Sequence, residues 1–89
     1  MKIKAGFVLE EVGGSYLACA TGALAAGFCG LVRLNETGAF LWGLLSDRDM
    51  TRDELLSAMT AEYEVSPEIA LHDIDAFVAK LRENGILDE

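Results

Sequence analysis

Three helix-start signals follow one another from residue 35 onward in this 89-residue chain, and they restrict its fold more than any other feature. The most specific is the capping box from Thr51 to Glu54, in which a hydroxyl and a carboxylate each bond a backbone amide that the helix leaves unpaired. Ser66 before Pro67 is a second start, because serine caps a helix and proline suits its first position. Asn35 is a third capping residue. These signals predict three consecutive helices.

Apolar residues recur at helical spacing after each start, and Asn84-Gly85 supplies a stop that places Ile86 against Leu81. We therefore expect helices at residues 36–45, 52–64 and 67–84, with the polar stretch from Ser46 to Asp49 ending the first. The three apolar faces are Gly38, Leu41, Trp42 and Leu45; Leu55, Leu56, Met59 and Tyr63; and Ala70, Ile74, Phe77, Val78 and Leu81.

The first half of the chain has the pattern of short strands, expected at residues 7–12, 15–20 and 28–34. Gly13-Gly14 suits a two-residue hairpin turn, whereas the Ala- and Gly-rich residues 20–27 predict no particular turn. The expected fold is a single α+β domain over residues 1–89. It is winged helix-turn-helix-like, with a three-stranded antiparallel N-terminal sheet followed by three helices.

Charge excludes several partners. Fifteen acidic and seven basic residues give a net charge of −8, which repels nucleic-acid phosphates and anionic membrane surfaces. The uncharged stretch from Tyr16 to Val32 is broken by glycines, so two strands and their connection are favoured over a membrane helix. The N-terminus lacks the apolar core of a secretory signal, and a cytoplasmic location is expected.

No catalytic or metal-binding motif stands out. Cys19 and Cys29 are ten residues apart and His72 is the single histidine, so no zinc ligand set is evident. Reduced, buried thiols are the favoured interpretation of the two cysteines, with a disulfide between adjacent strands as the alternative. The sequence predicts a non-enzymatic domain that folds without a metal or cofactor.

Several short motifs occur in a fixed order from Leu34 to Leu87. An Asn-x-Thr-Gly segment at residues 35–38 leads into a helix containing Leu41-Trp42. A threonine-capped helix, the junction Tyr-Glu-Val-Ser at 63–66 and the ending Gly-Ile-Leu at 85–87 follow. This order resembles the PqqD family.

The resemblance implies a peptide chaperone, also called a RiPP recognition element, that binds the leader of a ribosomally made precursor peptide. Such a domain presents the precursor to a modifying enzyme, often a radical SAM protein of the SPASM type. The leader would add a strand to the sheet, so that backbone hydrogen bonds supply affinity and neighbouring pockets supply specificity. By similarity the receiving edge is the strand at residues 28–34, with the last helix as the groove wall.

Eight residues are the candidate peptide contacts under this interpretation. Leu31, Ile69 and Phe77 have a competing role in the core, and the cations Arg33 and Lys80 either contact an acidic leader or are simply solvated. Alternation along the strand leaves open which face lines the groove. The candidates are Cys29, Leu31 and Arg33 on the strand, and Ile69, Asp73, Ala76, Phe77 and Lys80 on the last helix.

Two other functions are compatible with this fold. A winged-helix DNA-binding regulator needs a basic recognition helix, yet between Pro67 and Asn84 four acidic residues outnumber Lys80 and Arg82. A scaffold domain that self-associates through its sheet edge, as a homodimer, is the other alternative.

Overall fold

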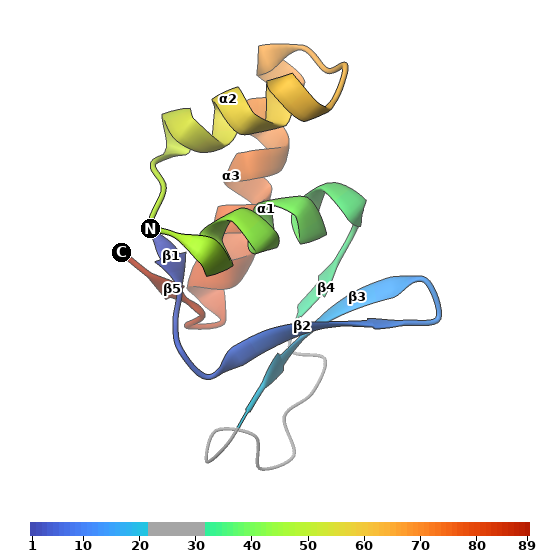
Figure 1. The fold of residues 1–89 in the computed structure, drawn as a ribbon, viewed down its shortest axis with the longest axis vertical. Helices are drawn as coiled ribbons and strands as arrows, with labels where there is room; N and C mark the ends of the chain where they lie inside the picture. The colour runs from blue at the N-terminus through green and yellow to red at the C-terminus, as the bar shows by residue number, and fades with distance from the viewer. Residues whose placement is uncertain (22–31) are drawn as a thin grey trace.

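The computed structural model describes residues 1–21 and 32–89 of the chain (Figure 1). Its described part has a three-stranded antiparallel sheet followed by three helices, which confirms the expected α+β fold. The elements are β1 (Lys2–Ile3), β2 (Phe7–Val12), β3 (Ser15–Ala20), β4 (Val32–Leu34), α1 (Glu36–Asp47), α2 (Arg52–Glu62), α3 (Pro67–Glu83) and β5 (Leu87–Asp88).

The sheet is built on a tight hairpin. Gly13 and Gly14 have φ angles of 58° and 82°, as a two-residue turn with two left-handed positions requires, and the pair Val12↔Ser15 closes it. The two strands have the bounds that the pattern predicts. β4 then pairs antiparallel with β3, giving the strand order β2-β3-β4. Of the strand expected at 28–34, only β4 falls within the described residues, at the edge of the sheet.

The three predicted caps are present. The Glu54 amide donates to the Thr51 hydroxyl at 3.2 Å, and the Thr51 amide donates to the Glu54 carboxylate at 2.9 Å, so the capping box is complete. The Ile69 amide donates to the Ser66 hydroxyl at 3.3 Å. Proline occupies the first turn of α3, as expected.

Helix ends differ from the prediction by one or two residues. α1 continues to Asp47, because polar residues such as Ser46 are compatible with a helix. The helix ends where the backbone becomes extended at Arg48. α2 stops at Glu62, since Tyr63 is extended and packs its ring edge-on against Phe40 at 5.4 Å. At the end of α3 the Ile86 amide donates to the Leu81 carbonyl at 2.9 Å, and the Schellman-type ending is confirmed.

One face of the sheet packs on the helices to form the core. Ala18, Val32 and Leu34 from the sheet belong to the same buried cluster as Trp42 of α1 and Phe77 of α3. In Figure 1 the sheet lies beneath the helices, with α1 passing in front of α3 and α2 above them. The packing fixes β4 relative to α1 and α3.

A second, two-stranded sheet joins the chain ends and was not predicted. β1 pairs antiparallel with β5, and both termini lie together in Figure 1. The Met1 ammonium group binds the Asp49 carboxylate, and the Met50 amide donates to the Met1 carbonyl at 2.9 Å. Strands of two residues are too short to show an alternating pattern, so they could not be predicted from local periodicity.

The described cysteine differs from expectation. Cys19 is buried and disulfide-bonded, so the interpretation of reduced thiols is wrong for this residue. Cys29 lies outside the described residues. Within residues 1–21 and 32–89 no helix is long and apolar enough to cross a membrane, and no three potential metal ligands cluster.

Candidate functional site

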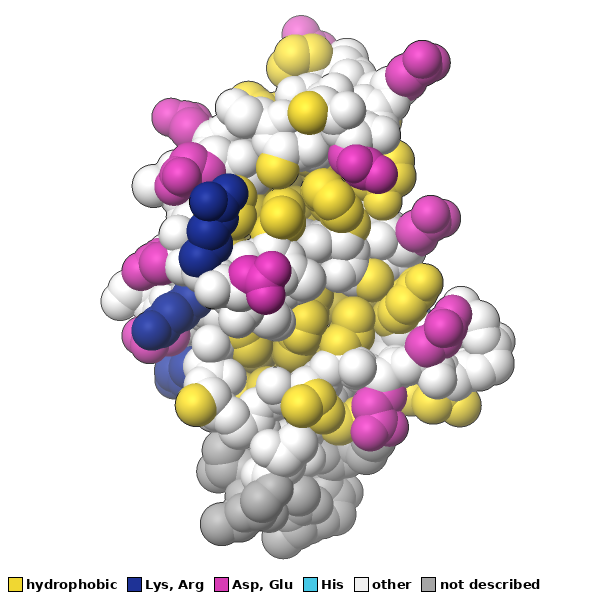
Figure 2. Space-filling view, in the orientation of Figure 1, with side chains coloured by type: hydrophobic (Ala, Val, Ile, Leu, Met, Phe, Trp, Pro, Cys, Tyr) yellow, Lys and Arg dark blue, Asp and Glu magenta, His cyan; other side chains and the backbone are white. Residues whose placement is uncertain are grey.

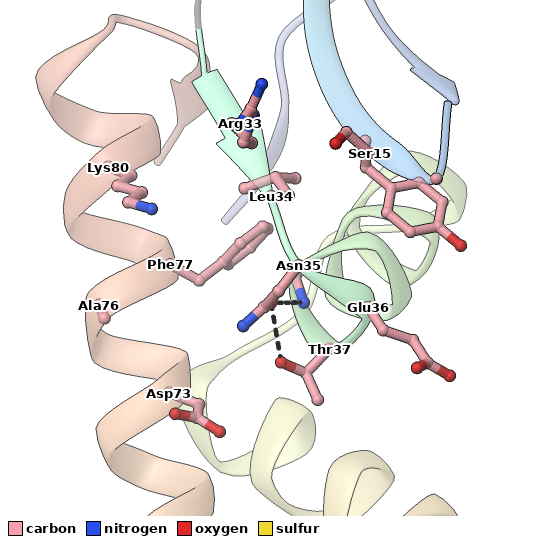
Figure 3. Close-up of a pocket in the computed structure, with 13 residues that line it drawn as sticks. Ser15, Arg33, Leu34, Asn35, Glu36, Thr37, Asp73, Ala76, Phe77 and Lys80 are labelled. Atoms are coloured by element: carbon pink, nitrogen blue, oxygen red, sulfur yellow. Dashed lines mark hydrogen bonds between the residues drawn. The ribbon is translucent and has the colours of Figure 1, made fainter. Parts of the chain in front are cut away.

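A groove of about 580 Å³ lies between β4 and α3 (Figure 3). Three parts of the fold line it: the turn and start of β3, the end of β4 with the first turn of α1, and one face of α3. The lining residues are Gly14, Ser15 and Tyr16; Arg33, Leu34, Asn35, Glu36, Thr37 and Gly38; and Asp73, Ala76, Phe77 and Lys80.

The β4 side of the groove is a sheet edge. β4 pairs with β3 on one side, and no other strand among the described residues pairs with it. Val32 and Leu34 are buried in the core while Arg33 between them is exposed, as alternation along a strand requires. Backbone amides and carbonyls on an unpaired edge are a template for a further strand.

The opposite wall is one face of α3. Asp73, Ala76 and Lys80 are spaced three and four residues apart, so their side chains lie one above another. Ala76 and Lys80 are exposed, whereas Phe77 is only 4% exposed and also belongs to the core. In Figure 3 the Phe77 ring points from α3 toward Leu34, and it closes the bottom of the space between helix and strand.

The junction of β4 with α1 forms the end of the groove. The side-chain oxygen of Asn35 accepts hydrogen bonds from the Gly38 amide at 2.8 Å and from the Thr37 hydroxyl at 3.0 Å. A Cβ atom on Gly38 would lie 3.1 Å from the Leu34 Cβ, which only glycine avoids. The Asn-x-Thr-Gly segment therefore caps α1 and lets the helix approach the strand closely.

Five of the eight residues predicted from the sequence lie together in this groove: Arg33, Asp73, Ala76, Phe77 and Lys80. Ile69 does not line it, because it lies about one helical turn before Asp73, where its side chain is 56% exposed. Cys29 and Leu31 lie outside the described residues.

Sequence reasoning missed the hairpin residues Gly14 to Tyr16 and the segment from Asn35 to Gly38. The second set had a signal, since it follows the proposed edge strand directly and carries the Asn-x-Thr-Gly motif. The first set had none, because only the pairing of Tyr16 with Leu34 brings the hairpin beside β4.

Ion pairs on α3 lie outside the groove lining. The Arg52 guanidinium donates two hydrogen bonds to Asp75, at 2.8 and 2.9 Å, and lowers the pKa of that carboxyl. Arg82 pairs with Glu89 in the same way, at 2.9 and 2.6 Å, and lowers the pKa of Glu89. Both arginines are therefore paired with carboxylates outside the groove, and neither ion pair includes a charged residue of the groove lining.

Comparison with known proteins gives two findings. The family model described as coenzyme PQQ synthesis protein D (PqqD) matches residues 25–87. A solved structure of TbiB1 in complex with the TbiA(beta) leader peptide aligns with a TM-score of 0.73 and 24% sequence identity, covering 99% of this chain and 95% of that chain. No curated protein matches the sequence.

Proposed function

The chain belongs to the PqqD family, and on that premise we propose that it is a peptide chaperone that binds the leader of a ribosomally synthesised precursor. The proposed site is the groove between β4 and α3. The likeness in fold to TbiB1, whose structure holds a leader peptide, supports this choice of ligand.

The mechanism is strand addition. An extended leader lies along the outer edge of β4 and exchanges backbone hydrogen bonds with it, while its side chains contact α3. The observation that carries this proposal is a strand with one described partner, β3, facing a helix across an open groove. Because backbone pairing supplies affinity, the α3 side chains supply discrimination between leaders.

The sheet has a second edge, at β2, which is a weaker candidate. Glu10 and Glu11 on β2 are both exposed, and charged side chains on an edge strand discourage pairing. The groove walled by α3 has no β2 residue among the described residues that line it, so a strand added at β2 would not contact that wall. The β4 edge is therefore the better candidate for binding the leader.

The protein acts without catalysing a reaction itself in this proposal. It holds the leader so that the rest of the precursor reaches a modifying enzyme, for which the family resemblance suggests a radical SAM protein of the SPASM type. Binding of the leader then holds the core peptide near the enzyme. This raises the effective concentration of the core peptide at the enzyme's active site.

Titration with a synthetic leader of the precursor peptide encoded beside this gene tests the proposal. We expect saturable binding by calorimetry. Two leaders can be compared, each N-methylated at every second residue and offset from the other by one residue. Only one of the two should lose binding, because alternate amides of an added strand face β4. Failure of the unmodified leader to bind would overturn the proposal, as would salt-sensitive retardation of duplex DNA.

Solution mass across a range of protein concentrations separates a receptor from a self-associating scaffold. We expect the free protein to stay monomeric and the complex to contain one leader per chain. A dimer that the leader cannot dissociate would mean that the edge serves self-association instead.

A further inference from the structure

The two ends of the groove carry opposite charge. Arg33 of β4 and Lys80 of α3 stand at one end, and Glu36 and Asp73 stand at the other. Figure 3 shows this order along α3: Lys80 points from the helix toward β4, and Asp73 lies nearer the first turn of α1. β4 and α3 run in opposing directions here, so Arg33 and Lys80 belong to the same end of the groove, while the Glu36 carboxylate points away from α3 in Figure 3.

These groove charges are not neutralised within the described part of the chain. The ion pairs there join the N-terminal ammonium to Asp49, Arg52 to Asp75, and Arg82 to Glu89. Arg33 and Lys80 take part in none of them. Acidic side chains are distributed widely over the surface, as the face in Figure 2 illustrates.

Arg33 and Lys80 are two of the few basic residues in this chain. The chain has seven basic residues against fifteen acidic ones, and two of the seven line this one groove. Two unpaired cations on the wall of a partly enclosed groove concentrate positive potential there, because the protein walls weaken solvent screening. A carboxylate is the side chain that this end would attract.

The helix sets the spacing. From Lys80 to Asp73 the rise along α3 is about 10 Å, and from Lys80 to the exposed Ile69 about 16 Å. An extended strand covers these lengths with about three and about five residues. The α3 face thus offers a cationic, then an acidic, then an apolar contact to one short extended segment.

We propose that this groove selects extended peptides with an Asp or Glu side chain at the Arg33 and Lys80 end, and disfavours acidic side chains at the Asp73 and Glu36 end. This inference rests on the proposed function and names the class of leader that the site prefers. A basic or uncharged residue faces Asp73, and an apolar residue beyond it reaches Ile69.

A pair of charge-reversal variants tests the proposal. R33E/K80E reverses the cationic end, and both residues are exposed, so the fold should be kept. K4E/R48E is the matched control, because it makes the same change in net charge at two exposed positions outside the groove. Comparing the two separates local from overall electrostatics.

The probe is a random 12-residue peptide library displayed on phage, selected against each protein. We expect the wild type and K4E/R48E to enrich Asp or Glu at one position of a short motif, and R33E/K80E to replace that preference with Lys or Arg. A synthetic peptide with the enriched motif should bind R33E/K80E at least about tenfold more weakly than the control.

Four results would overturn the proposal. Peptides enriched without any acidic preference, or an unchanged preference in R33E/K80E, would leave the leader-binding function standing but refute the charge selection. Equal weakening by R33E/K80E and K4E/R48E would assign the effect to net charge. If neither the library nor the neighbouring leader yields a binder, the proposed function fails along with this inference.

Discussion

The side-chain oxygen of Asn35 lies 2.8 Å from the amide nitrogen of Gly38 and accepts its hydrogen bond. Asn35 is the residue that directly follows β4, so this bond ties the edge strand to the first turn of α1. The same four residues, Asn35 to Gly38, line the groove. A helix cap in this protein is therefore also a wall of the candidate binding site.

Replacing Asn35 with Ala removes the cap and should destabilise the fold by about 1 kcal/mol, within the usual range for such caps. The measurement is urea unfolding at neutral pH. Asn35→Asp is the control, because its carboxylate still accepts from the Gly38 amide and suits the positive end of the helix dipole. An Asn35→Ala protein as stable as the wild type would show that the cap contributes nothing.

Gly38→Ala and Gly43→Ala should have opposite effects although both glycines lie in α1. Alanine favours a helix by about 1 kcal/mol, and a Cβ on Gly43 meets nothing within 4 Å, so Gly43→Ala should stabilise. On Gly38 the Cβ would press on the Leu34 Cβ at 3.1 Å and on Asn35 Oδ1 at 3.2 Å. Both neighbours are held in place, and Gly38→Ala should destabilise.

Thermal unfolding of the two variants beside the wild type measures this difference. Both variants make the same Gly-to-Ala change in one helix, so a loss of stability at Gly38 beside a gain at Gly43 reports the crowding at the junction of β4 and α1. Equal stabilisation of both proteins would mean that the strand yields easily there, and the close approach of α1 to β4 would then not explain the glycine.

The helices were predictable because their signals are local. Thr51, Glu54 and Ser66 act within one turn of the chain, and each bonds as its type and position indicate. The β1–β5 pair was not predictable, since it joins two residues at each end and depends on contacts such as Met50 to Met1. Helix ends shifted where a tertiary contact decided them, as for Tyr63 against Phe40.

The candidate site divides in the same way. The α3 residues Asp73, Ala76 and Lys80 follow from helical spacing once the face is chosen, and all three line the groove. Ile69 continues the same spacing but is exposed beyond the end of the groove. Its position could not be predicted, because helical periodicity does not indicate where the opposing strand stops. Ser15 enters the groove only through the pairing of β3 with β4.

Ala76→Trp should block leader binding without disturbing the fold. Ala76 is exposed at the centre of the α3 wall, so an indole there occupies the space of the added strand. We expect affinity for the leader to fall at least about tenfold, the loss of a well-packed contact. Calorimetric titration measures it.

The matched control is Ala79→Trp, since Ala79 is exposed on α3 but does not line the groove. Both variants add the same apolar surface to the same helix and should unfold at similar temperatures. Wild-type affinity in Ala76→Trp would place the ligand elsewhere, and equal loss in both would point to a general effect on the helix.

Stability should decline as the solution is acidified, in part through Asp75. The hydrogen bonds from Arg52 lower the pKa of this carboxyl from its ordinary value of 3.8, so the folded protein binds its proton less readily than the unfolded chain. The stabilisation is present above the unfolded pKa and is lost as the pH falls through the lower folded value. Glu54 in the capping box and Glu89 beside Arg82 also have a pKa lowered from the ordinary value of 4.5. They therefore change the stability in the same direction as Asp75 when the pH falls.

Asp75→Asn removes the contribution of Asp75, and its unfolding free energy should fall less steeply than that of the wild type between about pH 5 and pH 2. Glu64→Gln is the control, because Glu64 is exposed and forms none of the ion pairs of the described residues. Chemical denaturation at each pH gives the two slopes. Because neutralising other acidic groups also relieves the repulsion of a chain at −8, the slope relative to Glu64→Gln is the informative quantity. Parallel curves for the two variants would mean that the Arg52–Asp75 pair contributes no pH-dependent stability.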